Sequence, residues 1–195
     1  MPSESVFFDK SSIRIEAAKA RAEGARRLAE TAPFALAAFG PALGLAPASV
    51  VAGYWPIKEE IDPRPLMLVL AGLGHSLALP VVSGADQPLE FRAWPPGGAL
   101  IPGPHGTSQP PIDAATVDPD LLLVPLLAFD DGLYRLGYGG GYYDRTLARL
   151  RRHGKVRAVG LAYSAQRVPS LPVGPWDQRL DMVVTEQGLI GMHRA

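Results

Sequence analysis

The 195-residue sequence contains no cysteine, and this absence excludes disulfides, thiol nucleophiles and cysteine metal sites. It also has no excess of charge of either sign, because 19 Lys and Arg residues balance 19 Asp and Glu residues. A balanced chain has no global field that favours nucleic acid or an anionic membrane, so we expect neither as a partner. Any anion binding is therefore expected to be local.

The sequence also lacks a long uninterrupted apolar run. Its most apolar stretch, residues 66–82, is broken by glycine, histidine and serine and contains a proline, so it is too short and too interrupted to span a bilayer. The first ten residues, MPSESVFFDK, lack the basic and apolar regions of a signal peptide. These absences, with the missing cysteine, predict a cytoplasmic protein.

Helix-like and strand-like segments alternate along the chain. Helices are predicted at residues 9–30, 33–43, 64–75 and 142–152, and strands at residues 49–55, 77–82, 89–92, 121–125, 156–163 and 181–185. This alternation predicts an α/β fold with a mainly parallel, open, Rossmann-like sheet in a single three-layer domain. We expect that domain to cover residues 1–195, of which about residues 1–8 can be a disordered tail. The proline-rich segment 80–113 is predicted to be a long loop around one short strand, and such loops often bind ligands.

The most unusual stretch is RLGYGGGYYDR, residues 135–145. It follows a predicted buried strand and precedes a predicted helix, so its glycines lie at a helix N-terminus. Free backbone N–H groups and the helix dipole favour an anion there, and glycine lets the backbone approach it closely. The spacing matches neither the Walker A pattern nor the dinucleotide fingerprint. A strained turn whose tyrosines belong to the core is the competing interpretation.

Charged residues near this stretch have two interpretations each. Asp144 is either a carboxylate that favours the helix dipole or a Mg²⁺ ligand, and Asp177 or Asp181 could supply a second carboxylate. Lys10 and Arg14 lie four residues apart on a predicted helix and could reach a polyphosphate together, although such residues are more often surface charges.

The segment YWPIKEEIDPRP, residues 54–65, follows a predicted strand directly. In open α/β sheets the loops beyond the carboxyl ends of the strands form ligand sites. Two aromatic residues beside several carboxylates suit a flat, polar heterocycle. A turn with one buried aromatic residue explains the same pattern about equally well.

Taken together, these motifs resemble the 5-formyltetrahydrofolate cyclo-ligase family, also called 5,10-methenyltetrahydrofolate synthetases. The resemblance runs over nearly the whole chain, through KSSIR (10–14), YWPIKEEID (54–62), LPVV (79–82), LLLVPLLAFDDGLYRLGYGGGYYDR (121–145), VGLAYSAQRV (159–168) and LDMVVTE (180–186). It implies an enzyme that uses ATP and Mg²⁺ to close 5-formyltetrahydrofolate to 5,10-methenyltetrahydrofolate through a phosphorylated formyl group. It also implies a monomer or a weak homodimer with these small molecules as its partners.

The resemblance assigns site residues by position. ATP contacts are expected from Lys10, Arg14, Arg135, Leu136, Gly137, Tyr138, Gly139, Gly140, Gly141, Tyr142 and Tyr143, and we add Arg145 as a contact of the transferred phosphate. Folate contacts are expected from Trp55, Glu60, Tyr138, Gly139, Gly140, Gly141 and Tyr142. Asp144 and Asp177 are expected to bind Mg²⁺.

Two segments depart from the family pattern. Many members have Ile-x-Glu-Pro where this chain has TSQP (107–110), so the neutral Gln109 occupies the acidic position. Many also have Glu-x-His-Asp where this chain has GPWD (174–177), so Gly174 and Trp176 replace an acid and an imidazole. Loss of such supporting groups usually weakens a metal site. The departures leave open a folate- or nucleotide-binding homologue that has lost turnover. A sugar-phosphate isomerase or transferase that uses the glycines for a substrate phosphate is a further alternative, but it does not explain Trp55 and Glu60 together with Lys10 and Arg14.

Overall fold

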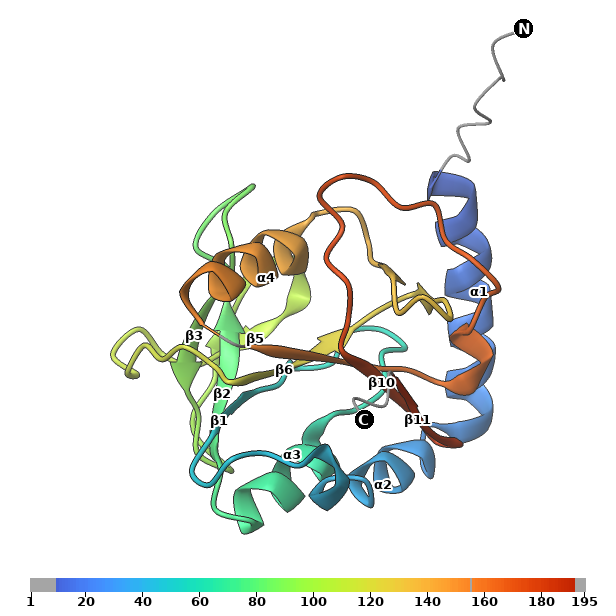
Figure 1. Ribbon diagram of the computed structural model, residues 1–195. Helices are drawn as coiled ribbons and strands as arrows, with labels where there is room; N and C mark the ends of the chain where they lie inside the picture. The colour runs from blue at the N-terminus through green and yellow to red at the C-terminus, as the bar shows by residue number, and fades with distance from the viewer. Residues whose placement is uncertain (1–9, 155, 192–195) are drawn as a thin grey trace, which may run out of the picture.

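A computed structural model describes residues 10–154 and 156–191, so the predicted tail at residues 1–8 lies outside the described residues. Helices cover both faces of a seven-stranded sheet in this part of the chain, as Figure 1 shows. The strand order is β11-β10-β9-β6-β1-β2-β3. The predicted α/β class with a mainly parallel open sheet is therefore confirmed.

Five neighbouring strands of the sheet run parallel, and an antiparallel strand closes each edge. The parallel strands are β10 (Met182–Thr185), β9 (Arg157–Leu161), β6 (Leu121–Pro125), β1 (Val50–Ala52) and β2 (Ser76–Val81). At the edges, β3 (Glu90–Ala93) pairs with β2 and β11 (Gly188–Gly191) pairs with β10. Short antiparallel edge strands such as these are common on otherwise parallel sheets.

Alternate residues of the sheet pack against different helices. Val51, Leu121 and Leu123 join the core formed with α2 (Ala32–Ala37) and α3 (Arg64–Gly72). Their neighbours Ala52 and Leu122 point to the opposite core, formed with α4 (Tyr142–His153). Successive side chains of a strand point to opposite faces, so nearly continuous apolar strands satisfy both layers.

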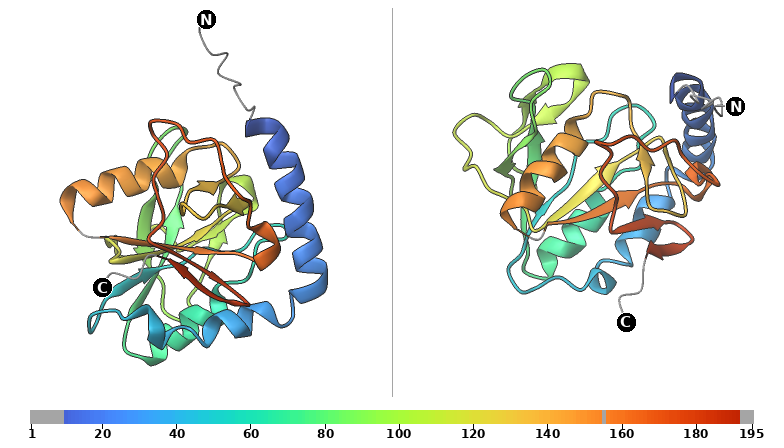
Figure 2. Two further views of the ribbon diagram at one scale, coloured as in Figure 1. Left: turned by 45° about the vertical axis from the view of Figure 1, so that its right-hand side comes forward. Right: turned by 45° about the horizontal axis from the view of Figure 1, so that its top comes forward.

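The longest helix of the described residues, α1 (Lys10–Leu28), lies along one end of the sheet rather than over either face, and the two views of Figure 2 agree on this position. Its contact surface consists of small residues. Ala17 packs against Leu127, Ala128 and Leu136 in a separate cluster. Gly24 lies so close to Tyr163 that an added Cβ would be 2.9 Å from the ring carbon Cγ.

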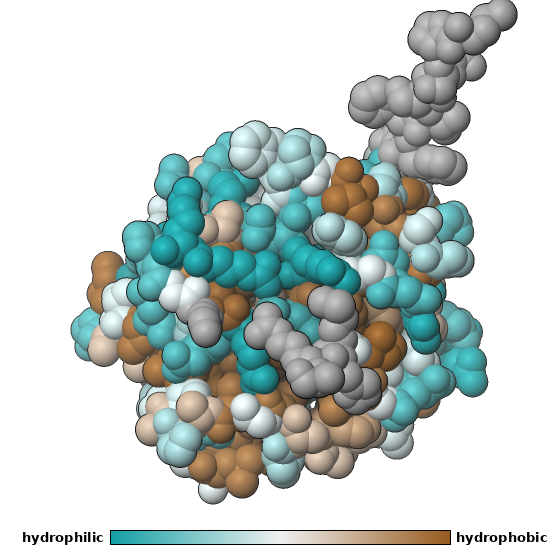
Figure 3. Space-filling model, in the orientation of Figure 1, coloured by the Kyte–Doolittle hydropathy of each residue, from teal (hydrophilic) through white to brown (hydrophobic). Residues whose placement is uncertain are grey.

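The two helical layers differ in the polarity of their surfaces. Figure 3 shows mainly polar side chains over α4, whereas apolar side chains reach the surface at the lower edge, where α3 lies. Leu68 of α3 and Leu73, which directly follows this helix, are both about half exposed. No helix of residues 10–154 and 156–191 combines the length and the apolar character needed to cross a membrane.

Several short elements differ from the sequence prediction. The predicted helix 33–43 is divided into α2 and the 3-10 turn η1 (Pro41–Leu43), and the segment 101–109 forms a hairpin of β4 (Ile101–Pro102) and β5 (Ser108–Gln109) around a 3-10 turn, η2 (Pro104–Gly106). Beyond β6 the chain forms a second hairpin, of β7 (Ala128–Phe129) and β8 (Arg135–Leu136), and after β9 a 3-10 turn, η3 (Ser164–Gln166). Strands of two residues are too short to show an alternating apolar pattern, so these hairpins could not be predicted from the sequence.

Candidate active site

A cavity of about 940 Å³ opens beyond the carboxyl ends of the central parallel strands. Tyr54 and Trp55 follow β1, Val82 follows β2, and Pro125 ends β6, and all four line it. The chain proceeds from β1 towards β2 and β3 on one side, and from β6 towards β9, β10 and β11 on the other. The cavity therefore lies at the point where the strand order reverses, which is the usual ligand position in open α/β sheets.

Every residue that the sequence assigned to ATP, folate or metal lies in the wall of this cavity. They are Lys10, Arg14, Trp55, Glu60, Arg135, Leu136, Gly137, Tyr138, Gly139, Gly140, Gly141, Tyr142, Tyr143, Asp144, Arg145 and Asp177. Asp181, the alternative second carboxylate, is not in this wall. It instead accepts hydrogen bonds from the Ala158 N–H at 2.8 Å and from Arg151 at 2.9 Å, which fixes α4 to the sheet.

The glycines form the turn between β8 and α4. Gly139 and Gly141 have φ angles of 102° and 65°, which favour glycine over any other residue. Two arginines hold the turn: Arg14 Nε donates to the Gly137 carbonyl at 3.0 Å, and Arg145 Nη2 donates to the Gly140 carbonyl at 2.6 Å. The segment is thus a tight turn that requires glycine and at the same time the loop that opens α4 at the cavity, so a turn-forming role and the predicted anion site are compatible.

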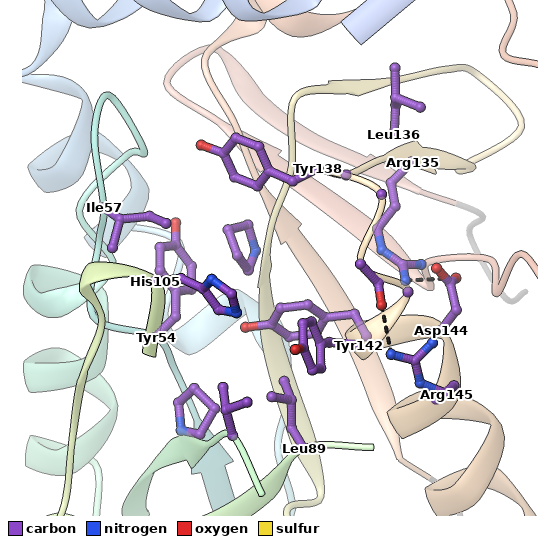
Figure 4. A pocket seen from close by; sticks show the side chains of 18 of the residues that line it. Tyr54, Ile57, Leu89, His105, Arg135, Leu136, Tyr138, Tyr142, Asp144 and Arg145 are labelled. Atoms are coloured by element: carbon purple, nitrogen blue, oxygen red, sulfur yellow. Dashed lines mark hydrogen bonds and ion pairs between the residues drawn. The ribbon is translucent and has the colours of Figure 1, made fainter. Parts of the chain in front are cut away.

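Two ion pairs lie beside the glycine turn. Arg135, whose side chain is 5% exposed, donates to Asp144 Oδ1 at 2.8 Å, and the Gln178 N–H donates to the same oxygen at 2.9 Å. Lys10 Nζ lies 2.6 Å from Asp177 Oδ2, which also accepts the Gly174 N–H at 2.6 Å. Figure 4 shows the Arg135–Asp144 pair in the cavity wall, opposite the aromatic side chains.

The Gly174 N–H and the Lys10 ammonium together keep Asp177 charged. Partial burial raises the pKa of this carboxyl, but the Gly174 N–H and the Lys10 ammonium outweigh burial and lower the pKa below its ordinary value. Gly174 occupies the position that the sequence comparison flagged as a lost acid. Its backbone N–H nevertheless supports the ionised carboxylate.

The two carboxylates that the sequence predicts as metal ligands are Asp144 and Asp177, and both lie in the cavity wall. Within the described ranges, no group of three His, Asp or Glu side chains is arranged to hold a metal. The hydrogen bonds that described residues make to the two carboxylates end on Oδ1 of Asp144 and Oδ2 of Asp177. Mg²⁺ commonly binds one or two carboxylates together with substrate phosphates, so this pair fits Mg²⁺ only in the company of a phosphate ligand.

The opposite end of the cavity is aromatic and contains one unusual carboxyl. Burial raises the pKa of Glu60 to about 7, although the Ile57 N–H, Arg21 and Lys58 oppose the shift. The neighbouring acids are paired elsewhere, because Glu59 contacts Arg21 at 3.3 Å and Asp62 binds Arg64 at 2.6 Å. Glu60 is therefore the acid of this loop that faces the cavity.

The tyrosines of the glycine stretch have different environments. Tyr143 packs against the core on the α4 side, as does one side of Tyr142. Figure 4 shows Tyr142, Tyr54 and His105 facing one another across the cavity. Tyr138 is 46% exposed, and its hydroxyl accepts a hydrogen bond from Arg21 Nη2 at 2.6 Å.

Sequence reasoning assigned no role to Arg21, which supports the cavity wall, or to His105, which lines the cavity. Arg21 is 2% exposed and connects α1 to Tyr138 and to Glu59. Its spacing of seven residues from Arg14 places it on the same helix face and could have indicated its role. His105 lines the cavity from the β4–β5 hairpin, with its ring centroid 6.4 Å from that of Tyr142. No sequence pattern indicated it, because that hairpin was predicted as loop.

Comparison with known proteins gives consistent similarities. The sequence model of the 5-formyltetrahydrofolate cyclo-ligase family matches residues 9–186. The chain is 38% identical over 143 residues to the 5-formyltetrahydrofolate cyclo-ligase of Escherichia coli K12, covering 71% of this chain and 78% of that protein. The NMR structure of Aquifex aeolicus 5,10-methenyltetrahydrofolate synthetase superposes with a TM-score of 0.74 at 32% identity, over 95% of this chain and 94% of that one. A 5,10-methenyltetrahydrofolate synthetase structure from Mycoplasma pneumoniae gives a TM-score of 0.68 at 25% identity, over 92% and 99% of the two chains.

Proposed function

The chain belongs to the 5-formyltetrahydrofolate cyclo-ligase family, and on this basis we propose that it cyclises 5-formyltetrahydrofolate to 5,10-methenyltetrahydrofolate with ATP and Mg²⁺, releasing ADP and phosphate. The observation that carries the proposal is that one cavity joins two chemically different ends. One end has the glycine turn, basic side chains and two carboxylates, and the other has aromatic side chains and Glu60. The site draws on residues from Lys10 to Gln178, so we also propose that the chain acts as a single domain.

The proposed reaction requires ATP because the formyl oxygen must be phosphorylated before it can leave. In 5-formyltetrahydrofolate the formyl carbon is bonded to N5 and its oxygen is a poor leaving group. We propose that this oxygen attacks the γ-phosphorus of ATP, so that the bond from the γ-phosphorus to ADP breaks. N10 then attacks the formyl carbon and loses its proton, and phosphate departs with the former formyl oxygen. Positioning and neutralisation of negative charge are then the main tasks of the protein.

The residues near the glycine turn suit that task. We propose that the turn, residues 137–141, directs backbone N–H groups at the phosphates while Lys10 and Arg14 neutralise their charge. Arg145 now donates to the Gly140 carbonyl and lies over the Tyr142 ring, 5.4 Å from its centroid. We propose that the Arg145 guanidinium turns from that carbonyl to the transferred phosphoryl group.

Asp144 and Asp177 are the residues that would hold Mg²⁺ together with phosphate oxygens. A bound Mg²⁺ would neutralise charge that develops on the phosphoryl oxygens.

At the other end of the cavity, Trp55 would pack against the flat pterin, and Glu60 would hold the pterin or the formamide through hydrogen bonds. Because the pKa of Glu60 is about 7, its carboxyl can donate as well as accept a hydrogen bond near neutral pH.

A single mixing experiment tests the proposed reaction. Protein, Mg-ATP and 5-formyltetrahydrofolate are combined, and the near-ultraviolet absorbance of the methenyl product is followed. We expect the absorbance to rise only when all three are present. Binding of folate and ATP without product would favour the alternative of a binding homologue with reduced turnover, which the altered residues Gln109, Gly174 and Trp176 motivate. Absence of binding for either ligand would contradict the assignment.

Asp144→Asn tests the role of the first carboxylate. The asparagine oxygen can still accept from Arg135 and from the Gln178 N–H, so we expect a free energy of unfolding within about 1 kcal/mol of wild type. The lost negative charge should lower Mg-ATP-dependent turnover about a hundredfold or more. Steady-state rates and urea unfolding measure the two effects.

The alanine variant is a weaker test of the same residue. Asp144→Ala removes the partner of the buried Arg135 guanidinium, so we expect it to lose about 1–3 kcal/mol of stability as well as activity. A wild-type rate in the folded Asp144→Asn variant would contradict the proposed metal role and would show that the Asp144 carboxylate only stabilises the start of α4.

A further inference from the structure

Trp176 is the most exposed aromatic side chain of the described residues, and it lies at the cavity. Its side chain is 82% exposed, yet the residue lines the cavity together with Lys10 and Asp177. The other two tryptophans of the chain are different, since Trp94 is 6% exposed and Trp55 is partly buried and packs edge-on against it at 6.0 Å. An exposed indole at the rim of a cavity calls for a physical explanation, because this ring gains most when an apolar or aromatic surface covers it.

The turn that carries Trp176 is closed at both ends. The Gly174 N–H donates to Asp177 Oδ2 at 2.6 Å, and the Asp177 N–H donates to the Gly174 carbonyl at 3.2 Å. Lys10 holds the same carboxylate at 2.6 Å and so ties the turn to α1. Pro175 further limits the backbone. The backbone that carries the indole is therefore ordered in advance, so a ligand that stacks on the ring loses little entropy in ordering the turn.

The position of Trp176 in the cavity indicates which part of a ligand it could contact. Trp176 adjoins Asp177, which with Lys10 belongs to the end where we place the triphosphate. The folate end has its own aromatic walls, from Tyr54, Trp55 and Tyr142. A nucleotide whose phosphates lie at the glycine turn has one further flat group, its base, which must continue outward from the charged end.

We infer that Trp176 is a stacking platform for the base of the nucleotide. The inference rests on the proposed function, since it needs a nucleotide in this cavity. Every base has a π-face, so stacking supplies affinity with little selectivity between purines. The departure that sequence comparison interpreted as a lost imidazole beside the metal is, on this account, a base contact of this chain.

Binding measurements with two ligands test the inference. Calorimetry compares Mg-ATP with Mg-tripolyphosphate, which has the phosphates but no base, for wild type, Trp176→Ala and Trp176→Phe. We expect Trp176→Ala to weaken Mg-ATP binding about tenfold and to leave tripolyphosphate binding unchanged. Trp176→Phe keeps a ring and should stay within about threefold of wild type. Phe34→Ala, at a 68% exposed aromatic residue on α2 away from the cavity, is the matched control and should bind both ligands like wild type.

Tryptophan fluorescence provides an independent readout. Mg-ATP should quench the exposed indole of wild type, whereas tripolyphosphate should not, and the quenching should disappear in Trp176→Phe. Equal loss of ATP and tripolyphosphate binding in Trp176→Ala would overturn the inference, because Trp176 would then act through the Asp177 turn. Quenching by 5-formyltetrahydrofolate that is seen in wild type and lost in Trp176→Phe would overturn it too, whereas quenching that persists in this variant comes from another tryptophan, such as Trp55 at the folate end. If wild type binds no Mg-ATP, the proposed function itself fails, and that result is recognised without any variant.

Discussion

Three acids in one loop have three different environments, although the sequence presents them almost side by side. Glu59 contacts Arg21, Asp62 binds Arg64, and Glu60 faces the cavity with a raised pKa. The sequence predicted that this loop would reach the site, because it follows a strand directly. Asp62 finds its partner two residues along the chain, whereas Glu59 is paired with Arg21 on α1, and this distant pairing could not be predicted from the sequence.

The raised pKa of Glu60 has a consequence for stability. Its pKa is about 7 in the folded protein, against an ordinary value of 4.5. Between these values the unfolded chain releases the proton while the folded chain keeps it, so stability falls as the pH rises and levels off above pH 7. The difference between the two pKa values corresponds to at most about 3–4 kcal/mol.

Glu60→Gln should remove this pH dependence. Urea unfolding at pH 5 and pH 8 should show a larger loss of stability for wild type than for the variant. Glu90→Gln, at an exposed position of β3, is the matched control and should behave like wild type. Identical pH dependence of wild type and Glu60→Gln would mean that the carboxyl is solvated in the folded protein.

At the scale of elements, the glycine turn depends on the helix that follows it. The sequence predicted a helix from about residue 142 and a strand at 121–125, and both are confirmed. It did not predict β8, whose two residues pair with β7 and deliver the chain to the turn. The apolar period of α4 is readable in the sequence, whereas the left-handed backbone of Gly141 follows only from the way β8 and α4 meet.

Two glycine substitutions separate backbone strain from mere addition of a methyl group. Gly141→Ala places a Cβ at φ 65° and 2.7 Å from Arg145 Nη1, so we expect a loss of about 1 kcal/mol or more in unfolding free energy. At Gly137 an added Cβ meets nothing within 4 Å, and Gly137→Ala should stay within about 0.5 kcal/mol of wild type. Equal stability of the two variants in urea unfolding would show that the left-handed turn is not maintained in solution.

At the scale of the whole molecule, the strand order creates the site. Alternation of strands and helices sufficed to predict a parallel sheet, but not that β1 lies between β2 and β6. This strand order pairs residue 51 with residues 77 and 121, and no local sequence pattern predicts pairing between such distant residues. The resemblance to a family supplied the residues of the site. Their convergence on one cavity is a result of this sheet order.

Ligands that bind this cavity should stabilise the whole fold. At about a hundred times its dissociation constant, each of Mg-ATP and 5-formyltetrahydrofolate should add about 2.7 kcal/mol to the unfolding free energy. For a chain of this size that corresponds to a rise in Tm of about 5–10 °C, which scanning calorimetry can measure. Asp144→Asn should lose the shift with Mg-ATP and keep the shift with folate. No shift with Mg-ATP in wild type would contradict the proposed nucleotide site.

The way α1 is attached has a consequence for motion. Lys10, Arg14 and Arg21 connect it to Asp177, Gly137 and Tyr138, while its apolar contacts come mostly from small residues. A helix with few large buried side chains can open locally at a lower free energy than the central strands. When α1 opens, the cavity loses one wall, so a bound nucleotide must hold the helix closed. The amide hydrogens of α1 would therefore exchange with solvent deuterium more slowly when the site is filled, and they report its occupancy more directly than those of the sheet.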